Sequence, residues 1–242
     1  MKAQPIKGSL DDPWSRMMTA SIAGDEGAYR RLLEDIGRSV RAMASRSRSG
    51  SAGGSRAALV IGLVGSAALY VLLLGPRPDI AAACMTMRFW LKFVDSFAFA
   101  LPSLLLTLRL ARPDAKPRAL ALWLIAPFVL LAAGVVAELL VVPQGEWLTR
   151  LIGHNSMFCM RMIPLLAAPI LAALIVALRA GAPLHPGLTG ALAGAASAGI
   201  AALLYSSHCP DDSPLFVATW YPLATLICMG VGALAGRRFL AW

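Results

Sequence analysis

The chain has 242 residues, of which 58% are hydrophobic and 14% are charged, and its formal net charge is +9. Soluble domains average roughly 45–50% apolar and about 25% charged residues, so a water-soluble fold of this length would expose too much apolar surface. The basic residues lie in the N-terminal segment and in short joints between apolar runs, which is typical of membrane proteins rather than nucleic-acid-binding proteins. The composition excludes a soluble domain and predicts a membrane protein without direct nucleic-acid contacts.

Residues 1–44 predict a short helical tail ahead of the membrane part. Asp12 and Asp25 are placed to cap two helices, with Pro13 at the first position of the earlier one. Both helices have an apolar face, formed by Trp14, Met17, Met18 and Ile22 in the first and by Tyr29, Leu32, Leu33 and Ile36 in the second. Because so small a hairpin cannot bury both faces, we expect a partner protein or the membrane surface to cover them, with a solvated helix that makes a few self-contacts as the alternative.

Residues 45–56, SRSRSGSAGGSR, predict a flexible tether between the tail and the membrane part. No apolar stretch in residues 1–56 is typical of a cleaved signal peptide, so we expect insertion to begin with the first span.

The remainder, residues 57–242, predicts an all-α bundle of six transmembrane helices. Each apolar run is close to the roughly 20 residues that cross the hydrocarbon core, and proline or glycine marks most of the joints. The predicted spans are 57–75, 93–110, 119–142, 160–178, 187–205 and 217–235. An even number of spans places both termini on one side of the membrane.

The Lys and Arg residues predict which side that is. With both termini in the cytoplasm, 17 of the 22 basic residues fall on the inside and 5 on the outside, as the positive-inside rule requires. Under this topology Cys84, Cys159 and Cys209 lie at or beyond the outer surface, and Cys228 is a packing residue within the sixth span.

Gly190 and Gly194 have the four-residue spacing that lets helix backbones approach closely. We expect this pair to pack within the bundle, with a homodimer interface as the alternative.

The polar stretch YSSHCPDDSPLF, residues 205–216, carries the most chemistry in the chain. Cys209 and Cys159 can meet at the outer end of the bundle and form a disulfide if their Cα atoms approach within about 7 Å. Alternatively, His154, Cys159, His208 and Cys209 offer the thiolate and imidazole ligands of a soft metal ion, although adjacent His208 and Cys209 do not easily bind one ion. The third alternative is two unrelated loop cysteines.

The carboxylates near the spans do not form a catalytic constellation. Asp211 and Asp212 suit a solvated loop or a helix cap, while Asp95 and Glu138 lie close enough to an interface to reach water. No C-x-x-C pair is present. We therefore expect no enzymatic activity and no cofactor other than a transiently bound soft metal ion.

Several segments resemble the NrsF family of six-span inner-membrane anti-sigma factors of Gram-negative bacteria. These are GPRPDI (75–80), MRFWLKF (87–93), MRMIPLLAAPILAALIVALRAGAP (160–183) after Cys159, HCPDDSPLFVATWY (208–221) and the closing GRRFLAW. The resemblance covers about residues 57–242. It implies that the protein sequesters an extracytoplasmic-function sigma factor, and that Cys159 and Cys209 are the family's periplasmic cysteines, through which heavy metals or oxidants trigger release of the sigma factor.

The tail departs from that family, because PWSRMMTASIAGDEGAYRRLLEDIGRSVRAMA (13–44) resembles the first helices of region 2 of an extracytoplasmic-function sigma factor. The chain is thus interpreted as a sigma-like tail joined to an anti-sigma membrane body.

Two other functions remain as alternatives. A small transporter or channel requires polar or broken segments within several spans, and apart from Pro102, Pro127 and Pro169 the spans offer few. A membrane thiol oxidoreductase requires a second cysteine pair or a quinone site, neither of which is evident.

Overall fold

The computed structural model describes residues 18–20, 22, 25–111, 118–181 and 183–241, and its regular secondary structure in these ranges is helical, without a strand. The chain divides into two compact units, residues 1–53 and residues 54–242. Each unit is described below by itself.

The first unit contains helical residues at 18–20 and 22 and the first part of α2 (Glu26–Leu73). The carboxylate of Asp25 accepts hydrogen bonds from the backbone nitrogens of Gly27 (2.8 Å) and Ala28 (3.0 Å), which confirms the predicted cap. Asp12, Trp14 and Met17 lie outside the described residues.

The predicted tether differs from the structure, because residues 45–56 are part of α2. Helix-favouring sequence lies on both sides of this segment and no proline interrupts it. Extending an existing helix adds one hydrogen bond per residue without a new nucleation cost, so a Ser/Gly-rich stretch between two helical stretches can remain helical.

The second unit contains six helical segments that are long and apolar enough to cross a membrane, as the sequence predicts. They are Gly54–Leu73, Met87–Leu110, Leu120–Val141, Gln144–Leu178, Pro186–Ser206 and Pro214–Phe239. Two of these segments begin well before the predicted positions. Gln144–Leu178 begins 16 residues before position 160, because it includes the short helical turns that precede the fourth span. The helix α4 (Met87–Leu110) begins six residues before position 93. Arg88 and Lys92, expected in an outer loop, are therefore part of this helix.

The third span is interrupted between α5 (Arg118–Leu122) and α6 (Ile125–Val141). Pro127 has no backbone N–H to donate to the carbonyl of Trp123, four residues earlier, and its ring crowds that carbonyl. The Trp123 oxygen instead accepts from Ala126 at 3.3 Å, which is the tighter turn expected at such a break.

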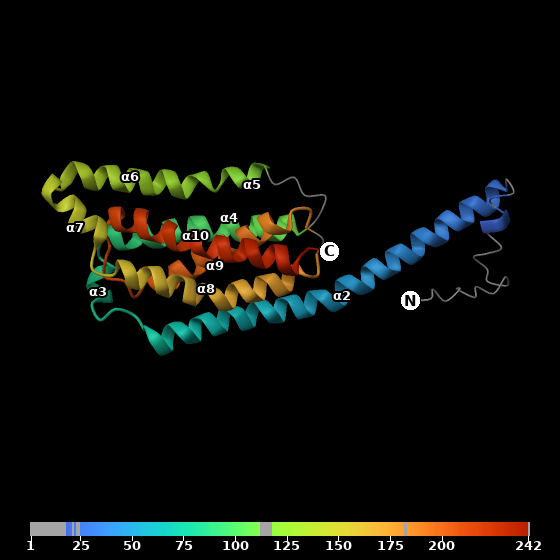
Figure 1. The fold of residues 1–242 in the computed structure, drawn as a ribbon, viewed down its shortest axis with the longest axis horizontal. Coiled ribbons are helices and arrows are strands. Elements are labelled where there is room, and N and C mark those ends of the chain that lie inside the picture. The colour runs from blue at the N-terminus through green and yellow to red at the C-terminus, as the bar shows by residue number, and fades with distance from the viewer. Residues whose placement is uncertain (1–17, 21, 23–24, 112–117, 182, 242) are drawn as a thin grey trace. The chain divides into compact units, whose positions relative to one another are not determined.

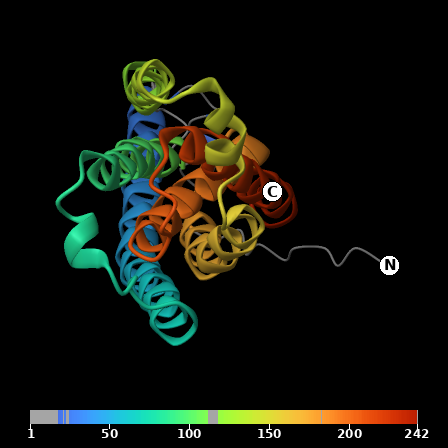
Figure 2. The ribbon, with the colours of Figure 1, turned by 90° about the vertical axis from the view of Figure 1, so that its left-hand side faces the viewer.

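α9 (Pro186–Ser206) lies at the centre of the second unit and packs against α4, α8 (Ser156–Leu178) and α10 (Pro214–Phe239), as the end-on view in Figure 2 also shows. α6 lies at the periphery, where Val129, Val136 and Leu140 are exposed. Apolar side chains on the outside of the bundle are suited to contact with lipid, because the hydrocarbon core of a bilayer contains no water.

The pair Gly190 and Gly194 packs within the bundle, against α10. A Cβ atom on Gly190 would collide with the backbone oxygen of Gly232, and one on Gly194 with that of Cys228. The close approach expected from the spacing is therefore found between α9 and α10, as in other small-residue helix pairs.

The short helices α3 (Ile80–Ala83) and α7 (Trp147–Ile152), with the turn η1 (Gln144–Glu146), lie at one end of the bundle. This end is at the left in Figure 1 and faces the viewer in Figure 2. We call it the α7 end. Residues 207–213, which join α9 to α10 there, are called loop 207–213 below.

Candidate functional site

Loop 207–213 carries Cys209, whose side chain is 0% exposed. The backbone nitrogen of Cys209 donates to the Tyr205 carbonyl at 3.0 Å, so the loop leaves α9 as a tight turn. The backbone oxygen of Cys209 accepts from Lys92 Nζ (2.7 Å) and Arg77 Nη1 (3.3 Å). Two cations from elsewhere in the chain therefore hold the main chain of this cysteine.

The same two cations bind Asp212. Lys92, which is 1% exposed, pairs with one oxygen of this carboxylate, and Arg77 donates to the other at 2.8 Å. Arg77 also binds Asp79, with two contacts of 2.7 Å. The hydrogen bonds that Arg77 makes to Asp79 and to Asp212 raise its pKa above the ordinary value. Burial lowers this pKa, but the hydrogen bonds outweigh it. Arg77, Lys92 and Asp212 thus form a largely buried ion network that fixes one side of the loop.

Asp211 fixes the other side by binding the N-terminus of α8. Its carboxylate accepts from the backbone nitrogens of Asn155 (2.9 Å) and His154 (3.2 Å) and from Asn155 Nδ2 (3.1 Å). A helix N-terminus has free N–H groups and a positive partial charge, both of which favour a carboxylate. The predicted role of an aspartate at the start of the last span is therefore wrong for Asp211, which binds the two residues ahead of α8 instead. Both aspartates are partly buried rather than solvated.

Cys159, on the first turn of α8, belongs to the same cluster of buried residues as Cys209. Both side chains are 0% exposed and both are free thiols. Tyr205, Phe216, Tyr221 and, further along α10, Cys228 belong to this cluster too, which we call the thiol cluster. The structure thus brings together the two cysteines that the sequence singles out, and it buries both side chains inside the protein.

The chemistry of Cys209 is suppressed in this arrangement. Burial raises the pKa of its thiol, and the nearby Lys92 ammonium opposes this effect only in part. Since the thiolate is the nucleophile and the metal ligand, a protonated and enclosed thiol is unreactive. Reaction of Cys209 with an oxidant or a metal ion therefore requires the loop to move.

The two histidines of the suggested metal set are not assembled with the cysteines. The side chain of His154 is 90% exposed, while His208 Nδ1 is 2.9 Å from the Gly75 backbone oxygen. Among the described residues, no group of three or more His, Cys, Asp and Glu side chains is arranged to hold a metal ion. Any metal capture in this arrangement would rest on the two thiols.

Glu138 does not face water as the sequence suggests. It is buried in α6 and accepts hydrogen bonds from Ser213 Oγ (2.8 Å) and the Leu215 backbone nitrogen (3.0 Å), at the start of α10. Arg150 approaches its other oxygen at 3.4 Å. A carboxylate from the third span thus caps the sixth, on the far side of the loop from Arg77.

The sequence-predicted partner surface of the tail is partly accessible. Met18, Ile22, Tyr29, Leu33 and Ile36 are exposed, whereas Leu32 is buried. An apolar face therefore remains open on the first unit.

Sequence reasoning missed the roles of Arg77, Lys92 and Glu138. Arg77 lies in GPRPDI and Lys92 in MRFWLKF, two of the segments that resemble the NrsF family. The resemblance did not indicate which residues these two side chains contact. The available signal was composition: charged side chains beside membrane spans are rare and need partners.

Comparison with known proteins identifies a family and two relatives. A family model described as NrsF, negative regulator of sigma F, matches residues 42–242. The chain is 36% identical over 192 residues to a protein named anti-sigma-F factor NrsF from Caulobacter vibrioides, with 77% of this chain and 89% of that protein covered. It is 34% identical over 198 residues to a probable anti-sigma-F factor NrsF from Azospira oryzae, with the same coverage.

No solved structure matches the chain at a significant level. The family match covers most of the chain, includes every residue of the ion network and the thiol cluster, and leaves out residues 1–41. The chain belongs to the NrsF family of anti-sigma factors.

Proposed function

We propose that this protein holds an extracytoplasmic-function sigma factor at the cytoplasmic face of the inner membrane and releases it when Cys159 and Cys209 react on the other side. The observation that carries the proposal is the joint burial of these two thiols under a loop held by ions from two other elements. Chemistry at the thiols and opening of the loop are therefore linked.

The charges of the described residues support the orientation. Arg109, Arg179, Arg237 and Arg238 lie at the ends of α4, α8 and α10 that are opposite the α7 end. Together with Arg112, Lys116, Arg118 and the ten basic residues that precede the first span, that side of the membrane holds 17 Lys and Arg, against 5 on the side of the α7 end. An excess of Lys and Arg is typical of the cytoplasmic side, so the α7 end would face the periplasm. Fusions of alkaline phosphatase and of green fluorescent protein to the C-terminus test this: the second should be active and the first inactive.

The trigger would be either oxidation of the two thiols to a disulfide or binding of a soft metal ion by both sulfurs. In the first, the two thiols lose two electrons and two protons to an oxidant as an Sγ–Sγ bond forms. In the second, a soft metal ion binds both sulfurs and two protons are released, since metal ligation requires thiolates. Either product would draw the first turn of α8 and loop 207–213 into a new arrangement.

Helices would carry this change across the membrane. α8, α9 and α10 each run from the thiol cluster to the opposite, basic end, and α9 and α10 touch through their backbones. A coupling free energy of about 1–3 kcal/mol between the two ends changes affinity for the sigma factor roughly 5- to 150-fold.

Co-purification with a co-expressed extracytoplasmic-function sigma factor tests the proposal. Cadmium or an oxidant should release the sigma factor from the wild-type protein but not from the Cys159→Ser, Cys209→Ser double variant. Cys228→Ser removes a third buried thiol of the same cluster, which lies within α10 rather than at loop 207–213 or the start of α8. It is the matched control and should respond like the wild type. Release from the double variant equal to that from the wild type would refute the thiol trigger.

The tail would contribute to the capture of the sigma factor. Tyr29, Leu33 and Ile36 recur at helical spacing on α2 and are exposed. Leu33→Ser should weaken retention, whereas Arg30→Ser, an exposed neighbour on the same helix, should not. Equal retention by both variants would assign the sigma contact to the membrane unit alone.

A further inference from the structure

A cavity of about 440 Å³ lies between α4, α6, α9 and α10, separate from the loop that covers the thiols. This volume is within the range of small-molecule sites. Its wall is predominantly apolar, and two lining side chains, Phe128 and Leu226, are 56% and 60% exposed. The cavity therefore opens on the side of the bundle, within the membrane-spanning region, where lipid-soluble molecules have access.

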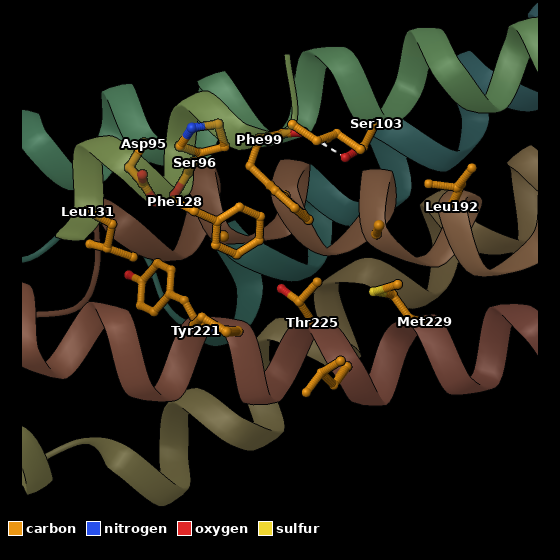
Figure 3. A pocket seen from close by; sticks show the side chains of 17 residues that line it. Asp95, Ser96, Phe99, Ser103, Phe128, Leu131, Leu192, Tyr221, Thr225 and Met229 are labelled. Carbon is orange, nitrogen blue, oxygen red and sulfur yellow. Dashed lines mark hydrogen bonds between the residues drawn. The ribbon is translucent and has the colours of Figure 1, made fainter. Parts of the chain in front are cut away.

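One end of the cavity is polar. Asp95, Ser96 and Tyr221 lie together there, while Leu192 and Met229 line the other end (Figure 3). Asp95 is 8% exposed and Ser96 is 4% exposed, and Asp95 Oδ1 and Ser96 Oγ have no hydrogen-bond partner among the described residues. Buried polar atoms are normally paired, so this end has unused capacity for a ligand.

The charges around Asp95 indicate the chemistry of that ligand. The described lining residues from all four helices include no Lys, Arg or His. Lys92, one turn away on α4, is already bound to Asp212 and to the Cys209 carbonyl. An acidic side chain at membrane depth is costly unless it is paired, and none of the described residues that line the cavity is a cation.

We propose that this cavity binds a lipophilic amine: a molecule with an apolar body and one protonated amino group, which enters from the bilayer and pairs with Asp95. The apolar body fills the space toward Leu192 and Met229, and the ammonium donates to Asp95 Oδ1 and Ser96 Oγ. Because Tyr221 also belongs to the thiol cluster, the ligand touches the wall of that cluster. The binding itself does not depend on the proposed sigma factor function.

Photo-crosslinking with two matched probes tests the site. Dodecylamine and dodecanol, each with a diazirine in the chain, are added to the full-length protein in lipid nanodiscs, and labelled peptides are mapped by mass spectrometry. We expect the amine to label peptides of α4, α9 and α10 about tenfold more than the alcohol, as a charge-assisted hydrogen bond allows.

Two variants separate the charge from the cavity. Asp95→Asn keeps the shape of the side chain, and should reduce labelling by the amine to that of the alcohol without reducing labelling by the alcohol. Ala195→Leu places a larger side chain on the cavity wall and should reduce labelling by both probes. The alcohol signal of Asp95→Asn also reports that the variant is folded.

The remaining outcomes overturn the proposal. Equal labelling of the wild type by amine and alcohol would exclude recognition of the charge, as would an Asp95→Asn variant that keeps its preference for the amine. Labels found only on the outer faces of α2 or α6 would show contact with bulk lipid rather than binding in the cavity.

Discussion

Lys92 Nζ donates a hydrogen bond to the backbone oxygen of Cys209 at 2.7 Å, which joins α4 to the loop that carries a buried thiol. The same ammonium pairs with Asp212, three residues further along that loop. One cation thus fixes both the main chain at the cysteine and the carboxylate that follows it. The enclosure of Cys209 depends on this side chain.

Replacing Lys92 should expose Cys209. Breaking a fully buried ion pair costs about 3–5 kcal/mol, but Asp212 is 18% exposed and keeps Arg77, so we expect a smaller effect. Alkylation of Cys209 in Lys92→Met should be about tenfold faster than in the wild type, as measured by mass spectrometry of the loop peptide. Arg88→Met, which changes an exposed cation one turn earlier on α4, is the control and should leave the rate unchanged. Equal rates in both variants would exclude a closing role for Lys92.

The pH dependence of the loop follows from the raised pKa of Cys209, whose ordinary value is 9.0. In the closed state the thiol keeps its proton to higher pH than in the unfolded chain, so the unfolded chain loses its proton first. The stabilisation from the buried neutral thiol is therefore complete below about pH 9 and is lost as pH rises above it. Protection from hydrogen exchange at residues 207–213, measured relative to the intrinsic base-catalysed rate at each pH, should therefore decrease above pH 9 in the wild type. In Cys209→Ser this alkaline step should be absent, and its persistence would assign the step to another group.

Glu138→Gln should destabilise the bundle, because α10 loses a charged acceptor at its N-terminus. Hydrogen bonds to charged groups contribute about 1.5–3 kcal/mol, and the glutamine retains part of this, so we expect a loss of about 1–2 kcal/mol in the free energy of unfolding. Unfolding in detergent measures the change. Glu146→Gln removes the exposed second partner of Arg150 and should cost less than about 1 kcal/mol. A larger loss for Glu146→Gln than for Glu138→Gln would contradict the role of the cap.

The contact between α9 and α10 can be tested with a matched pair of glycines. Gly190→Ala places a methyl group against the Gly232 backbone, and overpacking of this kind costs about 1–3 kcal/mol. Gly230→Ala on α10 meets no atom within 4 Å and should stabilise the helix by up to about 1 kcal/mol. Thermal unfolding distinguishes the two, and light scattering should give the same mass for both. A fall in mass with Gly190→Ala would instead support a dimer interface at this glycine.

Local sequence patterns predict the fold well. Apolar length predicts all six spans, Asp25 predicts the start of α2, and the Gly190–Gly194 spacing predicts a close helix contact. Each of these signals is contained within one segment. The joining of the predicted tether into α2 and the break before α6 were not predicted, because both depend on competition between neighbouring stretches of helix.

The candidate site was predicted only in part. The cysteines could be named from their positions, but their burial depends on Arg77 and Lys92, which are 132 and 117 residues from Cys209 in the chain. Asp95 and Glu138 look alike in sequence, as single carboxylates near the end of a span. One caps a helix and the other lies unpaired in a cavity, and only the packing of the helices distinguishes them.

The carboxylate of Asp211 at the start of α8 also constrains how the protein is made. The chain is synthesised from its N-terminus, so α8 is completed before Asp211, which binds the amides of His154 and Asn155 just ahead of this helix and lies 56 positions after Asn155. The opposite holds for α10, because its acceptor Glu138, in the third span, precedes Leu215 of α10 by 77 positions. During synthesis the acceptor for α10 is thus present before that helix forms, whereas the carboxylate that binds the backbone just ahead of α8 is added only with loop 207–213. The thiol cluster is consequently among the last parts of the molecule to close, because Cys159 is synthesised well before its neighbour Cys209.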